Sequence, residues 1–490
     1  MRTRLCRKTP SSARERAILS PGKDGEAGDV CSIVDAAGCG QAAKGPLEAR
    51  SSFPAQPTRL LMCVGAILLG LWALPSSMAA TVAPAASKAT ATLADVDARE
   101  ENWSHYLGPN FDLRPGSKRF HATSVAELWQ AEVKTGMCSV TVVDGLLYTM
   151  GNNGTKDKEQ EARDRVYCLD AETGEEEWVF DYACSLDPRL HPGGPSATPT
   201  VHEGKVYTCS KFGHIYCLDA KTGRKLWEAS AEHYKPRKPW WGFAASPTVM
   251  GEVVVYNIGD RGMALNKDTG QIVWQSEKSV VAYATPKPLP ADMFHRPAVA
   301  LLTNEAFLVL DPMSGQSVAT YTKPWKEKSN CNGVTPYIHE GHVYLVHSAH
   351  GMSRLSIDGN RLTEDWLATE GKYPNEWFAF NTHVIQGDHI FYLTKGKKSG
   401  TGLRCVNAET GKQVSLDEKY AFGNLLAVGN TLIMLSEEGE LIWGELNNTT
   451  FEEGYRKKIL KGLCWAKPVI LGKRLYARDA EGTVVCLRLL

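Results

Sequence analysis

The chain has 490 residues, 43% of them hydrophobic, and its 55 basic and 55 acidic residues give a formal net charge of zero. A chain of this length can bury the core of one large domain or of two ordinary ones. It contains no Lys/Arg-rich run and no basic stripe, so we expect no nucleic-acid partner.

The first 100 residues are not expected to contribute to a folded core. Residues 1–59 show no periodic apolar pattern and are predicted to be an unstructured extension. The apolar run "LLMCVGAILLGLWAL" at 60–74 is shorter than the roughly 20 residues of a membrane span, but it suits a signal peptide. Residues 60–79 are therefore predicted to be a signal peptide or a signal anchor, and 80–100 a disordered linker. Either alternative exports the rest of the chain to the periplasm or cell envelope, with membrane contact only through an inner-membrane anchor at 60–74.

A repeat organises the remainder. The stretches "YCLDAETGEEEW" (167–178) and "YCLDAKTGRKLW" (216–227) are near copies, and looser versions follow at spacings of roughly 45–49 residues. Each unit holds four short alternating runs rich in β-branched and aromatic residues, bounded by Gly, Asp and Asn. Four strands at this period are typical of a propeller blade.

The repeat count predicts an all-β, eight-bladed propeller of four-stranded antiparallel blades over residues 126–490, preceded by a lead-in segment at 101–125. The segment "AELWQAEV" (126–133) resembles a fourth strand without its first three, and the C-terminal residues supply three strands without a fourth. Pairing the two would complete the eighth blade and remove two open sheet edges.

The repeated turn has a structural explanation. The Asp or Asn before each "TG" can hydrogen-bond the turn backbone, and the Gly tolerates a positive φ. The Trp four residues after the Gly is expected to wedge between adjacent blades. Cysteines recur at one repeat position, so we expect them to pack as small apolar residues rather than form disulfides; these are Cys168, Cys217, Cys405 and Cys486.

The "LDAxTGxxxW" units resemble those of the pyrroloquinoline-quinone-like propeller family, which includes quinoprotein dehydrogenases and BamB-type outer-membrane assembly factors. The stretch "ENWSHYLGPNFDLRPG" (101–116) also resembles the lead-in of exported members. The resemblance covers nearly all of 126–490 and implies the fold, whereas one fold hosts unrelated functions. In the dehydrogenases, adjacent cysteines, a Trp and a calcium site hold the quinone, and this chain has no adjacent cysteines. We therefore expect no cofactor, with pyrroloquinoline quinone and calcium as the alternative.

Candidate ligand-binding residues lie in the loops that enter the first strands of blades two, three, five and six. Trp, Arg, Asn and His in these loops suit stacking on a planar ligand or gripping an extended peptide. The alternative is that the aromatic residues plug the channel and pack the loops. A run of four histidines at 339–350 spreads over turn, strand and turn, so we expect no metal site there. The candidates are Arg189, His191, Arg237, Trp240, Trp241, Phe243, Asn330, Asn332, Trp377, Asn381 and His383.

These observations predict an exported, non-catalytic, monomeric propeller that binds or scaffolds a protein or glycan partner of the cell envelope through its channel mouth and top loops. The alternatives are a quinone-dependent oxidoreductase of the alcohol or sugar dehydrogenase type, and a carbohydrate-binding propeller that uses Trp240, Trp241 and Trp377. No catalytic residue is assigned, because scattered carboxylates do not define an acid–base pair without geometry.

Overall fold

The computed structural model describes residues 102–115, 119–189, 191–231, 239–278, 280, 283–322, 332–347, 351–368, 383–396 and 400–490. The predicted extension (1–59), signal segment (60–79) and linker (80–100) lie outside the described residues. Among the described residues, no helix has both the length and the apolar character needed to cross a membrane.

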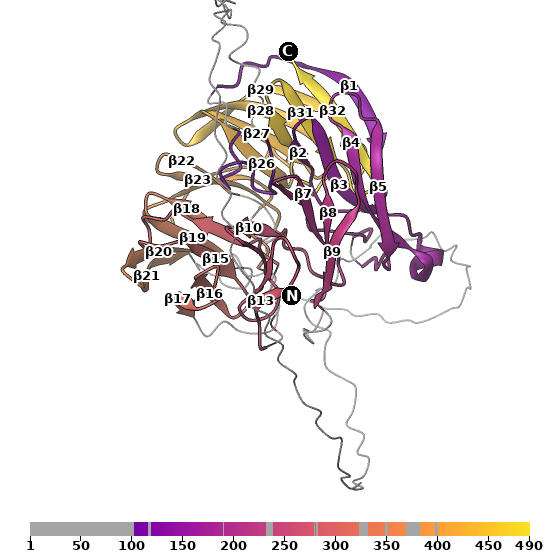
Figure 1. Ribbon diagram of the computed structural model, residues 1–490. Helices are drawn as coiled ribbons and strands as arrows, with labels where there is room; N and C mark the ends of the chain where they lie inside the picture. The colour runs from indigo at the N-terminus through magenta and orange to yellow at the C-terminus, as the bar shows by residue number, and fades with distance from the viewer. Residues whose placement is uncertain are drawn as a thin grey trace, which may run out of the picture. The chain divides into compact units, whose positions relative to one another are not determined.

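The described residues form eight four-stranded antiparallel sheets, which are the blades of a β-propeller (Figure 1). Blade 1 contains β2 (Thr141–Val143), β3 (Leu146–Asn152), β4 (Arg163–Asp170) and β5 (Glu176–Ala183), with a short 3-10 helix, η2 (Lys156–Glu161), between β3 and β4. Blade 2 contains β6 (Thr200–His202), β7 (Lys205–Cys209), β8 (His214–Asp219) and β9 (Lys225–Ser230). Blade 3 contains β10 (Thr248–Met250), β11 (Val253–Tyr256), β12 (Met263–Asn266) and β13 (Ile272–Gln275). Blade 4 contains β14 (Lys287–Leu289), β15 (Ala298–Leu302), β16 (Ala306–Leu310) and β17 (Ser317–Thr322).

The second half of the ring follows the same pattern. Blade 5 contains β18 (Tyr337–His339), β19 (His342–His347), β20 (Gly351–Asp358) and β21 (Arg361–Ala368). Blade 6 contains β22 (Val384–Gln386), β23 (His389–Thr394), β24 (Gly402–Asn407) and β25 (Gln413–Asp417). Blade 7 contains β26 (Gly423–Val428), β27 (Thr431–Ser436), β28 (Glu440–Asn447) and β29 (Thr450–Lys458). Blade 8 contains β30 (Val469–Leu471), β31 (Arg474–Arg478), β32 (Thr483–Leu489) and, from the other end of the sequence, β1 (Val125–Glu132).

The predicted closure is confirmed. Strand β1 runs antiparallel beside β32, with Trp129 opposite Cys486 (Figure 1). The buried guanidinium of Arg478 in β31 then ties blade 8 to blade 1, because its Nη1 donates to Met150 O at 2.7 Å and to Thr149 Oγ1 at 2.8 Å. Strand β1 therefore completes blade 8 as its outer strand, and β32 is not left as a free edge.

The apolar core lies between neighbouring blades. Side chains of blade 8, such as Trp129 and Tyr476, pack in one buried cluster with side chains of blade 1, such as Leu147 and Tyr167. Similar clusters fill the other boundaries. Burying such faces contributes roughly 25 cal/mol for each Å² of apolar surface removed from water, so blade-to-blade packing is the main source of stability.

The repeated turn acts across blades, as predicted. Asp219 Oδ1 accepts the backbone N–H groups of Lys221 (3.2 Å) and Thr222 (3.0 Å), which shapes the turn. Gly223 has a φ of +68°, and a Cβ added there would lie 2.6 Å from the indole of Trp178 in the preceding blade. Trp178 Nε1 also donates to Ala220 O at 3.0 Å. The same contact recurs for Trp129 on Gly174, Trp227 on Gly270, Trp274 on Gly315 and Trp366 on Gly411.

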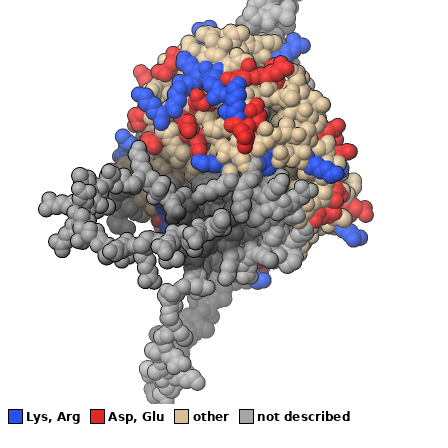
Figure 2. Space-filling model, turned by 180° about the vertical axis from the view of Figure 1, so that it is seen from behind, with Lys and Arg blue, Asp and Glu red and all other residues tan. Residues whose placement is uncertain are grey.

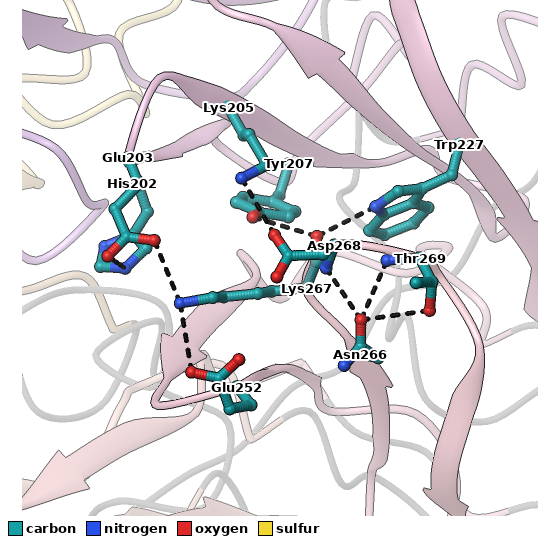
Figure 3. Close-up of polar contacts among 10 residues, drawn as sticks. All are labelled: His202, Glu203, Lys205, Tyr207, Trp227, Glu252, Asn266, Lys267, Asp268 and Thr269. Atoms are coloured by element: carbon teal, nitrogen blue, oxygen red, sulfur yellow. Dashed lines mark hydrogen bonds and ion pairs between the residues drawn. The ribbon is translucent and has the colours of Figure 1, made fainter. Parts of the chain in front are cut away.

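Polar contacts reinforce the boundary between blades 2 and 3 (Figure 3). Lys267 O accepts Trp227 Nε1 at 3.0 Å and Tyr207 Oη at 3.2 Å. The ammonium of the same lysine reaches Glu203 Oε2 at 3.0 Å and Glu252 Oε1 at 3.6 Å. Both carboxylates are exposed, so these ion pairs orient the hairpins and contribute little free energy.

The cysteines of the described part are free, and the four at the repeat position are buried in the core as predicted. On the face shown in Figure 2, basic and acidic side chains lie beside one another. One such pairing lies in blade 7, where Arg456 of β29 reaches both Glu440 and Glu453 at 2.9 Å.

The lead-in segment crosses the bottom end of the ring, defined as the end where the first strand of each blade turns into the second. Trp103 forms a β-bridge with Val142 of β2, and His105 contacts Pro247 O of blade 3 at 3.1 Å. Further along, Arg114 Nη2 donates to Ile385 O in β22 at 2.6 Å. Residues 102–115 thus contact blades on both sides of the channel and cover this end.

Candidate functional site

The opposite, top end is where the last strand of one blade connects to the first strand of the next. Arg189 lies in the loop between blades 1 and 2, and Trp240 in the loop between blades 2 and 3. The guanidinium carbon of Arg189 lies 4.3 Å from the centroid of the Trp240 ring. Trp240 is nevertheless 57% exposed, which is unusual for an indole and marks a candidate contact surface.

The same two loops supply a second pair, His191 and Trp241. The rings of His191 and Trp241 have centroids 5.5 Å apart at an interplanar angle of 33°. His191 Nδ1 accepts the N–H of Gly193 at 3.1 Å, which assigns the ring proton to Nε2. Burial, and to a smaller extent the nearby Lys211 charge, lowers the pKa of His191 to about 4. The imidazole is therefore neutral at pH 7. We call Arg189, His191, Trp240 and Trp241 the mouth patch.

Two cations near the mouth patch, Arg189 and Lys211, face two carboxylates, Asp187 and the buried Asp164. Asp187 pairs with Arg189 (Nη2 to Oδ1, 3.0 Å). The buried ammonium of Lys211 donates to Asp187 O at 2.7 Å and lies 3.7 Å from its Oδ2. Asp187 and Lys211 were not among the sequence candidates, because they stand 24 residues apart and only the fold brings them together.

Two of the other candidates are packing residues in the structure. Phe243 is buried between blades 2 and 3 and faces Gly213. Asn332 is fully buried, and its Nδ2 donates to Thr303 O at 3.0 Å. Both placements match the packing alternative considered for these loops. Four candidates lie outside the described residues, namely Arg237, Asn330, Trp377 and Asn381.

His383 lies in the channel rather than on the rim. It packs against Tyr392 (ring centroids 4.7 Å apart) and borders a cavity of about 20 Å³ together with Lys287, Asp112 and Thr335. A cavity of this size holds about one water molecule. Burial lowers the pKa of Lys287 to about 8, so this small space is bordered by a desolvated ammonium.

The channel contains a second buried ammonium that the sequence analysis missed. Lys467 Nζ lies 3.6 Å from the ring centroid of Tyr106 in the lead-in segment, and burial holds the pKa of this lysine well below its usual range. Other blades carry a hydroxyl at this repeat position, where Thr198 N–H donates to Ser246 Oγ (2.9 Å). The lysine in "AKPV", where other blades read "ATPT" or "ASPT", is the signal that could have identified it.

The donor set in the channel does not fit a calcium-bound quinone. Hard oxygen ligands, mainly carboxylates, are what calcium requires. Around the channel the described residues instead present Lys287, Lys467, His105 and the single carboxylate of Asp112. Throughout the described part of the chain, no group of three or more His, Cys, Asp or Glu side chains could hold a metal ion.

Fold and site together define an eight-bladed propeller of the pyrroloquinoline-quinone-like class. The family model described as "Outer membrane protein assembly factor BamB" matches residues 162–416, and the chain belongs to this family. Among curated proteins, none matches the sequence significantly.

Solved structures share the architecture. BamB from Moraxella catarrhalis aligns over 74% of this chain and 100% of its own, with a TM-score of 0.54 and 13% identity. A europium-containing methanol dehydrogenase aligns over 81% of this chain and 100% of its own, with a TM-score of 0.62 and 11% identity. The quinohemoprotein alcohol dehydrogenase from Comamonas testosteroni aligns over 79% of this chain and 80% of its own, with a TM-score of 0.56 and 13% identity. At these identities the likeness concerns the fold alone.

Proposed function

We propose that this chain is an exported, non-catalytic binding or scaffolding protein of the cell envelope, and that its partner docks on the mouth patch. Membership of a family named for outer-membrane protein assembly supports a scaffolding role. The apolar run at 60–74 supports export. The observation that carries the proposal is the 57% exposure of Trp240, placed under a guanidinium on the loop-bearing end of the ring.

An exposed Trp–Arg pair is suited to binding a partner. Burying an indole on association removes a large apolar area from water, and Trp and Arg dominate the energetics of interfaces. Asp187 already neutralises Arg189, so a partner can cover the pair without stranding a charge. Neither Arg189 nor Trp240 belongs to the buried core of the blades. The blades therefore do not need this pair in order to fold.

A photo-crosslinking amino acid at position 240, introduced into the full-length chain in envelope-bearing cells, tests the proposal. The matched control places the same group at Leu128, which is 42% exposed on β1 in blade 8. We expect a discrete crosslinked species from position 240 and none from position 128. Equal yields from both positions, or none from 240, would contradict the proposal.

The oxidoreductase alternative is tested on the same purified protein. We expect added pyrroloquinoline quinone and calcium to support no dye reduction with alcohols or sugars, because the described channel lacks the carboxylates for the metal. Redox turnover would overturn the non-catalytic assignment.

A further inference from the structure

We propose that the mouth patch binds a neutral carbohydrate chain, an inference that rests on the proposed function of the patch as the docking surface. Three properties of the patch point to this ligand class: its balanced charge, its hydrogen-bond donors without an acceptor among the described residues, and its exposed aromatic face.

The charge balance argues against a strongly charged ligand. Asp187 pairs with Arg189 and also contacts the buried ammonium of Lys211. Lys211 interacts electrostatically with a second, buried carboxylate, Asp164, so two carboxylates face the two cations. His191 adds no charge at neutral pH, since its pKa is lowered to about 4. An anionic or cationic ligand would have to break or compete with these internal pairs. A neutral ligand leaves them intact.

The hydrogen-bond inventory calls for a ligand that supplies acceptors. With Nδ1 occupied by the Gly193 N–H, His191 presents Nε2–H as a donor. In the described part of the chain, no group accepts from this N–H or from the indole Nε1–H of Trp240 or Trp241. Sugar hydroxyl and ring oxygens are acceptors of the required kind, and hydroxyl groups can at the same time donate to Asp187.

The aromatic surface supplies the apolar half of the contact. Arg189 covers one face of the Trp240 ring at 4.3 Å, and the 57% exposure of this residue leaves indole surface open to solvent. The negative face of an indole attracts the weakly positive C–H groups on the flat side of a pyranose ring. Trp241, half-buried beside His191, extends the surface to a second position.

The test is calorimetric titration of the purified chain with neutral linear hexasaccharides, namely α- and β-linked glucose, β-linked xylose and β-linked N-acetylglucosamine. We expect saturable binding of at least one of them. Trp240→Ala should weaken it about tenfold or more, and His191→Phe, which keeps the ring and loses the donor, should weaken it less. Leu128→Ala is the matched control and should bind like the parent protein. Unchanged circular dichroism of each variant shows that folding is intact.

Salt dependence and the crosslinking result separate the outcomes. Because the ligand is uncharged, we expect the affinity to change less than twofold between about 50 mM and about 500 mM salt. No binding of any neutral hexasaccharide, or binding only of acidic chains with a steep salt dependence, overturns the inference. If position 240 still crosslinks to a protein in that case, the proposed function survives without the carbohydrate. If neither result is obtained, both fail.

Discussion

Individual buried groups in the lead-in segment show how the chain adapts to crossing a channel. His105 is 2% exposed, and its ring nitrogens are both committed: Nδ1 accepts Leu107 N–H at 3.2 Å, and Nε2 donates to Pro247 O at 3.1 Å. Burial is the largest reason that the pKa of His105 falls to about 3, and the charges of Lys467 and Lys287 lower it further. Between about pH 3 and pH 6.5, this imidazole therefore stays neutral in the folded protein, whereas it is protonated in the unfolded chain.

This difference predicts a pH dependence at the residue scale. Between pH 6.5 and about 3 the unfolded state binds more protons at His105 than the folded state, so the free energy of unfolding falls as the pH falls through that window. At about pH 5, His105 alone lowers the free energy of unfolding by about 2 kcal/mol relative to its value at neutral pH. Gln at position 105 can still donate to Pro247 O but does not titrate. Between neutral pH and pH 5, we therefore expect the free energy of unfolding of His105→Gln to fall by about 2 kcal/mol less than that of the parent. Urea unfolding at the two pH values measures it, and an equal loss in both proteins would contradict the assigned pKa.

At the scale of the element, the turn of one blade is a contact surface for the Trp of the blade before it. Gly223 and Gly204 offer a matched test, because both have a positive φ, of +68° and +71°, and only Gly223 faces an indole. Each Gly→Ala change incurs the strain of a left-handed alanine, roughly 1 kcal/mol. Gly223→Ala must in addition displace Trp178, so we expect it to be about 2 kcal/mol more destabilising than Gly204→Ala. Thermal or chemical unfolding decides this, and equal losses would show that the indole can move away freely.

These elements also explain what the sequence could and could not predict. The turns, their Trp partners and the incomplete terminal blade were predictable, because each is written in short local patterns that recur in every unit. The pairing of Arg189 with Trp240 was not, because the two loops differ in length and composition and their contact depends on the folded ring. Phe243 and Asn332 could not be told apart from surface residues of the same loops, since burial there is set by neighbouring blades. Lys467 was within reach, as a lysine at a position where other units carry a hydroxyl.

At the scale of the whole molecule, one closed ring brings distant loops to a common mouth. Strand β1 must lie on β32, because only then do eight complete blades surround the channel. The half-buried Ala126 and the exposed Arg488 face each other across this pair. Cα atoms directly opposite in an antiparallel pair are about 4.5–5.5 Å apart, within the span of a disulfide.

The most direct measurement is disulfide formation in the double variant Ala126→Cys/Arg488→Cys, with each single variant as control. We predict near-complete intramolecular oxidation of the double variant and a higher unfolding midpoint than its reduced form, because the crosslink closes a loop that spans the entire propeller. The single variants should show neither effect. If the double variant stays reduced under oxidising conditions, or crosslinks only between molecules, the ring is not closed by β1, and the shared mouth that carries the binding patch is contradicted.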